Sequence, residues 1–319
     1  MSRWKSMQER VDDYLITRRR LGYQLKVEGD ELYRFARFAD EHWNNKALTI
    51  EIAVAWANSS KKASDIYPAR RMETIRGLAK FCALFEPETQ IPPPGLLGHG
   101  HRRVAPHIYT EEELSNLMQA AIKLNPKKGI RPVTMQYLIG LLSATGLRIS
   151  EALRLNRSDV DFERELLLIR ETKFCKSRYV PLHQTTIDAL IQYGRIRDRF
   201  TSEGSGSNAF FLFDNGRSPN YRQALYAFQS IRRQLGWDRN SERLPRLHDL
   251  RHTFACNRLL LWYKQGVDVN NAILRLSVYL GHSKISDTYW YLTAIPSLMA
   301  IAAKRFERFT FMGKEVKHA

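Results

Sequence analysis

Apolar residues recur at intervals of three and four positions through the first eighty-odd residues, which is the spacing of an amphipathic helix. Residues 11–21 and 32–38 show this pattern first, and residues 50–56 and 67–85 repeat it. Thr49 stands immediately before the third of these segments, where a threonine can cap a helix. The pattern predicts a small all-helical unit over residues 1–88.

The composition changes after Pro87, where three consecutive prolines and several glycines replace the helical period. We expect residues 89–108 to be a linker. His99 and His101 lie in it with two arginines, but no carboxylate or thiol is near, so we interpret this stretch as an extended segment that contacts phosphate or solvent rather than as a metal site.

Residues 109–319 form the second predicted unit, which begins with Thr110 ahead of an acidic helical turn and with Glu113 at the capping-box position. Residues 133–144 are almost wholly apolar, which predicts a buried helix, and Gly146 supplies the turn that ends it. Residues 165–170 and 178–182 then read as two strands joined by a polar link. The predicted fold is mainly α with a small antiparallel β-sheet, divided into two domains.

The charge balance points to a polyanionic partner. The chain of 319 residues carries 50 Lys and Arg against 33 Asp and Glu, a net charge of +17, and nucleic acid is the first candidate for such a protein. Cationic clusters at residues 18–20, 61–62 and 70–71 fit either solvated helix faces or contacts with a phosphate backbone. Both interpretations stay open.

Several other classes are excluded. The sequence has no run of about 18 apolar residues, and its first residues are charged, so we expect neither a membrane span nor a signal peptide but a soluble, cytoplasmic protein. Its cysteines, Cys82, Cys175 and Cys256, are odd in number and far apart, which favours reduced thiols over a disulfide framework.

The chemistry-bearing residues gather late in the chain. His248 and Arg251 lie one helical turn apart and can bind one anion together. Gly281 and His282 follow, and then come Tyr289 and Tyr291. A phosphate is the anion that this combination fits best.

Arg148 lies between the helix-ending Gly146 and a following apolar helix, beside free backbone N–H groups. It could belong to the same anion site, or it could be a surface arginine that pairs with Glu151. From the residues alone the second interpretation is at least as good.

Four motifs together resemble the tyrosine recombinase family, the phage-integrase-like enzymes that exchange DNA strands. They are ATGLRISEAL at 144–153, TKFCKSRYVPL at 172–182, HDLRHTFA at 248–255 and YLGHSKISDTYWYL at 279–292. Their order and spacing both match. The resemblance spans residues 109–292, and the helical first unit is similar to the core-binding domain of that family.

The resemblance implies a role for each matching residue. Arg148 and Arg251 would clamp the scissile phosphate. His248 would position the phosphate and the nucleophile and take up a proton, and His282 would donate a hydrogen bond to the phosphate. Lys173 matches the lysine that acts as general acid for the leaving 5′-hydroxyl.

Lys176, in the same segment, fits that position less well. In this family the nucleophilic tyrosine follows the second histidine by nine residues, which selects Tyr291 and leaves Tyr289 as a packing or surface residue. The product would be a 3′-phosphotyrosyl DNA end, so the reaction needs no nucleotide cofactor. Glu151 and Asp249 are expected to brace the site.

A metal site is the alternative for the histidines, because His248 and His252 have the spacing of zinc ligands. Asp249 stands where a zinc protease has glutamate, and Arg251 would place a cation beside the ion. We therefore expect no metal.

The resemblance thus predicts a site-specific DNA recombinase of the integrase or transposase type. Its two domains would form a clamp on duplex DNA. It would bind double-stranded recombination sites as a dimer and form a tetramer in the synapse, with a C-terminal helix over residues 298–309 docked on a neighbour. Accessory recombinases or DNA-bending proteins could take part. A type IB topoisomerase and a non-enzymatic DNA-binding regulator of the same fold are the alternatives. Phage integration and chromosome-dimer resolution stay open beside the favoured role in a mobile element.

Overall fold

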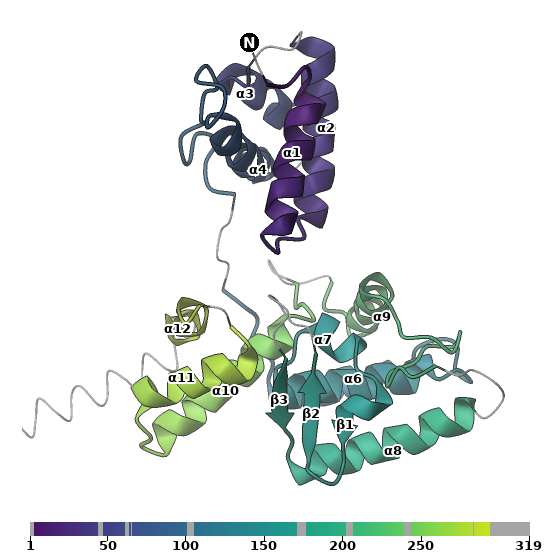
Figure 1. The fold of residues 1–319 in the computed structure, drawn as a ribbon. Coiled ribbons are helices and arrows are strands. Elements are labelled where there is room, and N and C mark those ends of the chain that lie inside the picture. The colour runs from purple at the N-terminus through teal and green to yellow at the C-terminus, as the bar shows by residue number, and fades with distance from the viewer. Residues whose placement is uncertain are drawn as a thin grey trace, which may run out of the picture. The chain divides into compact units, whose positions relative to one another are not determined.

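The computed structural model describes residues 3–43, 47–60, 64, 66–100, 105–170, 177–201, 207–238, 244–282 and 284–293. The chain divides into two compact units, residues 1–104 and 105–319 (Figure 1). Mainly helical structure with one small sheet confirms the predicted fold class. No helix among the described residues is long and apolar enough to cross a membrane.

The described residues of the first unit form four helices, as the period of its apolar residues predicts. They are α1 Met7–Arg20, α2 Lys26–His42, α3 Ile50–Asn58 and α4 Tyr67–Cys82. Thr49 caps α3 as expected, since its side chain accepts a hydrogen bond from the backbone of Ile52. The rings of Phe35 and Trp56 meet edge to face in the core, with centroids 5.3 Å apart.

A buried ion pair ties the start of this unit to its end. Arg10 of α1 donates to both carboxylate oxygens of Glu86, at 2.8 and 2.7 Å, and the two side chains are 1% and 4% exposed. Removing one partner of such a pair by mutation would leave the other as an uncompensated buried charge. The pair therefore fixes the segment after α4 against α1.

The predicted linker is bound to the first unit along part of its length. The backbone N–H of Gln90 donates to the Leu48 carbonyl at 2.8 Å. The Arg76 guanidinium donates to the carbonyls of Pro92 and Pro93 at 2.9 Å each. These bonds hold a segment that lacks any helical period. Residues 101–104, which include His101, lie outside the described residues.

The second unit begins with a closely packed helix pair, α5 and α6, that contributes to its hydrophobic core. Its helices are α5 Glu111–Ile122, α6 Arg131–Thr145, α7 Ile149–Leu153, η1 Arg157–Asp159, α8 Gln184–Thr201, α9 Tyr221–Gln234, α10 Asp249–Lys264, α11 Val269–Leu280 and α12 Ser286–Thr293. Thr110 and Glu113 form the predicted capping box of α5. Helix α6 ends at Gly146, whose φ of 62° favours glycine.

The sheet is the predicted hairpin with one short strand added. Its strands β1 Val160–Asp161, β2 Leu166–Ile169 and β3 Arg178–Pro181 are antiparallel in the order β1-β2-β3. Leu167 pairs with Val180, and both are fully buried against the core. The link that carries Lys173, Cys175 and Lys176 lies outside the described residues.

Helices α10, α11 and α12 pack against one another (Figure 1). Residues 259–280 form the end of α10, a short turn and the whole of α11, with Asp268 as the N-cap of α11. Cys82 and Cys256 are buried free thiols. Residues 298–309, the predicted C-terminal helix, lie outside the described residues.

Candidate active site

The first turn of α10 is anchored by a buried carboxylate. Asp249 is fully buried and accepts hydrogen bonds from the backbone N–H of Arg246 at 2.9 Å and from its Nη2 at 2.7 Å. Tyr109 adds a second anchor, because its backbone N–H donates to the Thr253 hydroxyl at 2.9 Å. The predicted bracing role of Asp249 fits these contacts, which fix where His248 and Arg251 project.

Arg251 joins the ends of two other helices. Its Nη1 donates to the carbonyl of Gly146 after α6, and its Nη2 donates to the carbonyl of Leu280 at the end of α11, both at 2.7 Å. Helix C-termini carry unpaired carbonyls and partial negative charge, which favour a cation. Burial lowers the pKa of Arg251 to about 10, so the group stays positively charged at neutral pH.

Arg148 binds the carbonyl of Gly281, which directly follows the Leu280 carbonyl that Arg251 binds. Its Nη2 donates to the Gly281 carbonyl at 3.1 Å and its Nη1 donates to Glu151 at 2.9 Å. The side chain keeps 31% of its surface exposed, whereas that of Glu151 keeps only 2%. Arg148 does pair with Glu151, as one interpretation of the sequence expected. Because the Glu151 carboxylate is buried, it fixes the guanidinium of Arg148 in place, while the exposed part of the Arg148 side chain keeps N–H groups available for a ligand.

Arg178 of β3 is a site residue that our sequence reasoning missed. Its Nη1 and Nη2 donate to the two carboxylate oxygens of Glu151, at 3.0 Å each. Burial by itself raises the pKa of Glu151, but hydrogen bonds and charge from Arg178 and Arg148 outweigh it and lower that pKa to about 2. Strand alternation was the available signal, because Arg178 lies two residues before the buried Val180 and so shares its face.

His282 follows Gly281, whose left-handed φ of 68° ends α11. Its Nδ1 lies 2.7 Å from the hydroxyl of Thr288, a residue that is fully buried. Burial lowers the pKa of His282 to about 3, with further lowering by the charges of Arg251 and Arg148. The imidazole is therefore neutral at pH 7.

His248 is the N-cap residue of α10. Surrounding protein lowers its pKa to about 4, and the charges of Arg251 and Arg246 add to that effect, although the residue keeps an exposed surface. A neutral, accessible imidazole at pH 7 can accept a proton.

The structure distinguishes the two candidate tyrosines. Tyr291 is 2% exposed and its ring stacks on that of His282, with centroids 6.0 Å apart. Burial raises its pKa, while the charge of Arg251 and a hydrogen bond to it act in the opposite direction. Tyr289 is 42% exposed, so Tyr291 alone of the two lies among the arginines and histidines.

Two predictions remain, one on the lysines and one on a metal. Lys173 and Lys176 lie outside the described residues. Within the described part of the chain, no group of three or more His, Cys, Asp or Glu side chains could hold a metal ion. Asp249, which lies between the two histidines in the sequence, pairs with Arg246 at 2.7 Å.

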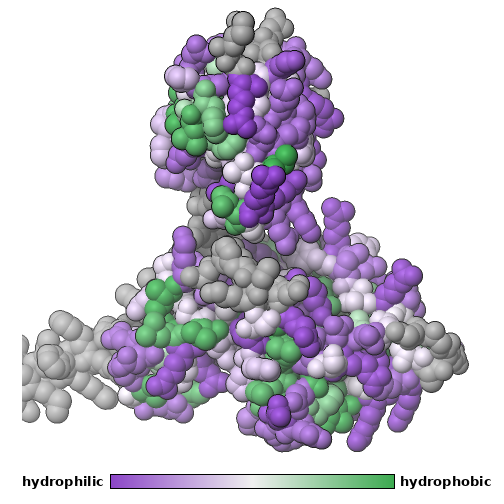
Figure 2. All heavy atoms as spheres, viewed as in Figure 1, coloured by the Kyte–Doolittle hydropathy of each residue, from purple (hydrophilic) through white to green (hydrophobic). Residues whose placement is uncertain are grey.

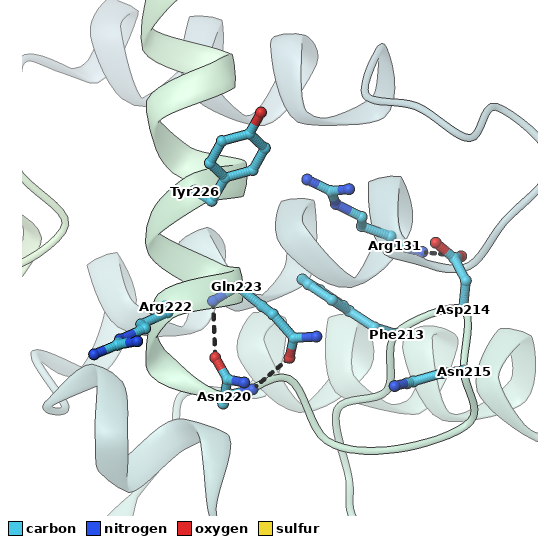
Figure 3. A pocket seen from close by; sticks show the side chains of 8 residues that line it. All are labelled: Arg131, Phe213, Asp214, Asn215, Asn220, Arg222, Gln223 and Tyr226. Atoms are coloured by element: carbon cyan, nitrogen blue, oxygen red, sulfur yellow. Dashed lines mark hydrogen bonds between the residues drawn. The ribbon is translucent and has the colours of Figure 1, made fainter.

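A separate open pocket of about 510 Å³ lies at the starts of α6 and α9 (Figure 3). Arg131, Phe213, Arg222 and Tyr226 line it, and Asn220 caps α9 through reciprocal hydrogen bonds with Gln223 at 2.9 Å. The arginines and histidines of the site described above, Arg148, Arg178, His248, Arg251 and His282, do not line this pocket. The surface drawn in Figure 2 is mostly hydrophilic, with apolar residues in smaller groups, which suits a polar ligand.

The match to known proteins settles the family. The model of the phage integrase family matches residues 107–296. The chain belongs to that family. A putative integrase/recombinase of Sinorhizobium fredii is 37% identical over 307 residues, which cover 95% of this chain and 98% of that relative. The tyrosine recombinase XerC of Chlamydia trachomatis is 31% identical over 222 residues, covering 70% and 65% of the two chains.

Solved structures agree on the fold. The integrase of transposon Tn1549 in complex with transposon right-end DNA has a TM-score of 0.69 at 16% identity and covers 96% of this chain and 99% of its own. The recombinase XerH bound to its difH substrate has a TM-score of 0.63 at 19% identity, over 87% and 78% of the chains. As a phage integrase family member, this protein is a site-specific recombinase, an enzyme that breaks and rejoins DNA strands.

Proposed function

We propose that Tyr291 attacks a DNA phosphate held between Arg148 and Arg251. The observation that carries this proposal is the pair of consecutive carbonyls, Leu280 and Gly281, which bind one arginine each. Adjacent carbonyls bring the two guanidinium groups to one place, and the next residue, His282, stacks on the ring of Tyr291. Fixed donors of this kind stabilise the charge that grows on non-bridging oxygens during phosphoryl transfer.

The reaction is balanced without a cofactor. The Tyr291 oxygen bonds to phosphorus, the bond from phosphorus to the 5′-oxygen breaks, and a 3′-phosphotyrosyl end and a free 5′-hydroxyl result. His248 accepts the phenol proton, and Lys173 gives a proton to the leaving 5′-oxygen. His282 donates a hydrogen bond to the phosphate. Religation reverses these steps with a different 5′-hydroxyl.

The partner is double-stranded DNA that carries the recombination site. The net charge of +17 supports this, and Arg19 and Arg20 are exposed at the end of α1. One structural relative is a lambda integrase dimer bound to a core site, and another is a transposon integrase on transposon DNA. We propose a dimer at each site, a tetramer in the synapse and a role in moving a mobile element, and a DNA substrate favours a cytoplasmic location.

Suicide substrates test the chemistry. A duplex nicked within the crossover region, taken from the ends of the element that encodes this protein, traps the covalent complex because the cleaved strand diffuses away. Wild type should form an adduct that survives denaturation, with tyrosine on a 3′-phosphate, in the presence of a chelator. Tyr291→Phe should abolish it, and Tyr289→Phe is the matched control that should retain it.

Two results would change the assignment. An adduct that persists in Tyr291→Phe and disappears in Tyr289→Phe would transfer the nucleophile to Tyr289. Specific DNA binding with no adduct in the wild type would favour the alternative of a DNA-binding regulator.

A further inference from the structure

A second arginine-lined pocket, of about 370 Å³, has the Glu151 carboxylate in its wall. It lies among α7, η1 and the end of β2, and Arg154 and Arg170 are the arginines among the described residues that line it. Arg154 is the C-cap of α7, and Arg170 directly follows β2. Because Arg148 binds the same Glu151 carboxylate at 2.9 Å, this pocket adjoins the candidate active site.

Both arginines of the pocket are held through Nε. The Nε of Arg170 donates to Asp159 at 2.5 Å, and the side chain of Asp159 is 2% exposed. The Nε of Arg154 donates at 3.0 Å to the Ser150 carbonyl, one helical turn earlier. Both arginines keep exposed surface. Their terminal Nη groups, which make no hydrogen bond to a carboxylate among the described residues, are thus fixed at one end and open to a ligand.

Positive charge is in excess around this pocket. Asp159 is already bound by Arg170, and Glu151 is bound by two arginines of the active site. Among the described residues that line the pocket, no carboxylate is left to neutralise Arg154. An anion from outside the chain would complete this arrangement.

A nearby arginine shows the ordinary alternative. Arg157, on η1, is 57% exposed and donates to the exposed Asp198 at 2.8 Å, and it does not line the pocket. It therefore has the partner of its own that Arg154 lacks. The difference separates a surface arginine with a carboxylate beside it from one whose terminal nitrogens face a cavity.

Phosphate is the anion that these two side chains fit best. Guanidinium groups bind phosphate oxygens in pairs, and arginines that are already ordered lose little conformational entropy on binding. Successive phosphates of one DNA strand advance by about 3.4 Å along the duplex axis. Two phosphate sites that share the wall of Glu151 would therefore be filled by phosphates close together on one strand.

We propose that Arg154 and Arg170 bind a second phosphate of the cleaved strand, within about two nucleotides of the scissile one. The inference rests on the proposed function, which places the scissile phosphate between Arg148 and Arg251. One bound phosphate fixes a point on the strand, whereas two also fix its direction. Arg154 and Arg170 are therefore positioning residues that orient the strand for attack by Tyr291.

Methylphosphonate linkages test this contact one phosphate at a time, because each replaces a charged oxygen by a methyl group. The recombination-site duplex carries one such linkage at each position around the scissile phosphate, and Tyr291→Phe protein prevents cleavage during the binding measurement. A linkage within about two nucleotides of the scissile phosphate should raise the dissociation constant about tenfold. Adding Arg154→Gln should raise it equally on unmodified DNA and remove the response to that linkage.

Arg154→Gln is the main variant because it leaves the pair of Arg170 and Asp159 intact. The slope of the logarithm of its affinity against that of salt concentration should be shallower by about 0.9, the value for one phosphate. Arg154→Lys should recover part of the affinity, since it keeps the charge without the paired geometry. Arg157→Gln removes the same charge outside the pocket and should keep the affinity of its parent and its response to the linkage.

The outcomes separate this inference from the proposed function. If the wild type forms no adduct on the suicide substrate, the proposed function fails, and this inference with it. If the adduct forms but Arg154→Gln binds as tightly as Arg157→Gln, or its effect multiplies with that of every linkage, the second contact is overturned and the nucleophile stands. Coupling only to a more distant phosphate would overturn its placement beside the scissile one.

Free phosphate is the other source of the same chemistry. Inorganic phosphate should raise the thermal midpoint of wild type and Arg154→Gln equally, because the pocket is expected to hold the phosphate only as part of DNA. A rise that Arg154→Gln loses while its affinity for DNA stays unchanged would assign the pocket to free phosphate and overturn the proposal.

Discussion

Arg178 and Glu151 form a bidentate ion pair, with two N–H···O distances of 3.0 Å. The pair joins β3 to α7, and the Nε of Arg178 extends it to α11 by donating to the Tyr279 carbonyl at 2.8 Å. Three elements that are far apart in the sequence are thus fixed around one carboxylate, which in turn holds Arg148. The geometry of the phosphate site therefore depends on a residue that never needs to contact the phosphate.

Arg178→Met should destabilise the second unit strongly, because it leaves the charge of Glu151 buried with less compensation. The expected loss in the free energy of unfolding is about 3 kcal/mol, measured by urea denaturation. Arg178→Lys keeps the charge and loses the paired geometry, so its free energy of unfolding should lie between those of the wild type and Arg178→Met.

The matched control is Arg164→Met, which removes an arginine that is 80% exposed and 3.9 Å from Asp161. Surface pairs of this kind contribute little, so the control should be close to wild type. Equal stability of the Arg178 and Arg164 variants would show that the pair has no structural role.

The same carboxylate predicts a dependence of stability on pH. Its pKa is about 2 in the folded chain, against an ordinary value of 4.5. As the pH falls below about 4.5, the unfolded chain binds a proton that the folded chain does not, so the stabilisation is complete above that pH and is lost toward pH 2. Its full size is on the order of 3 kcal/mol.

Glu151→Gln cannot titrate, so the difference in unfolding free energy between wild type and this variant should shrink as the pH falls from 5 toward 2. Urea denaturation at a series of pH values measures it. Glu163→Gln removes an exposed carboxylate and controls for net charge. A difference that stays constant over this range would contradict the lowered pKa.

Gly281→Ala should damage the site beyond its effect on the backbone. Gly281 has a φ of 68°, and a Cβ there would lie 2.8 Å from Nη1 of Arg178. Gly266 has a φ of 75° with no neighbouring atom within 4 Å of its Cβ position. Each alanine should cost about 1 kcal/mol for the left-handed conformation, but only Gly281→Ala should also slow cleavage of the suicide substrate. Equal cleavage by the two variants would argue against a tight fit of Arg178 under Gly281.

Thr288 is expected to set the tautomer of His282. If Nε2 of a neutral His282 donates to the phosphate, its Nδ1 must accept the hydrogen bond from the Thr288 hydroxyl, 2.7 Å away. Thr288→Val keeps the shape and removes that donor, so cleavage should fall by about tenfold or more, whereas Thr288→Ser should keep most of it. Wild-type cleavage by Thr288→Val would mean that Nδ1 carries the proton or that His282 does not donate to the phosphate.

The sequence determined much of this protein because local signals suffice for it. The helical period of the first unit, the Thr49 and Thr110 caps and the Gly146 turn fix elements through bonds between near neighbours, and all of them are found in the structure. The order and spacing of the motifs indicated the family and predicted the site residues, because a spacing such as that from His282 to Tyr291 can be read directly from the sequence.

Only the tertiary structure decided how those residues meet. Arg178 escaped notice because its importance comes from Glu151 and Tyr279, which are 27 and 101 positions away. Nδ1 of His252 is buried without a hydrogen-bond partner among the described residues, and this too cannot be read from a sequence, since it depends on which groups surround a buried ring. Hydrogen bonds to the consecutive carbonyls of Leu280 and Gly281 bring two arginines together from separate segments, and contacts of that kind follow from packing in three dimensions rather than from spacing along the chain.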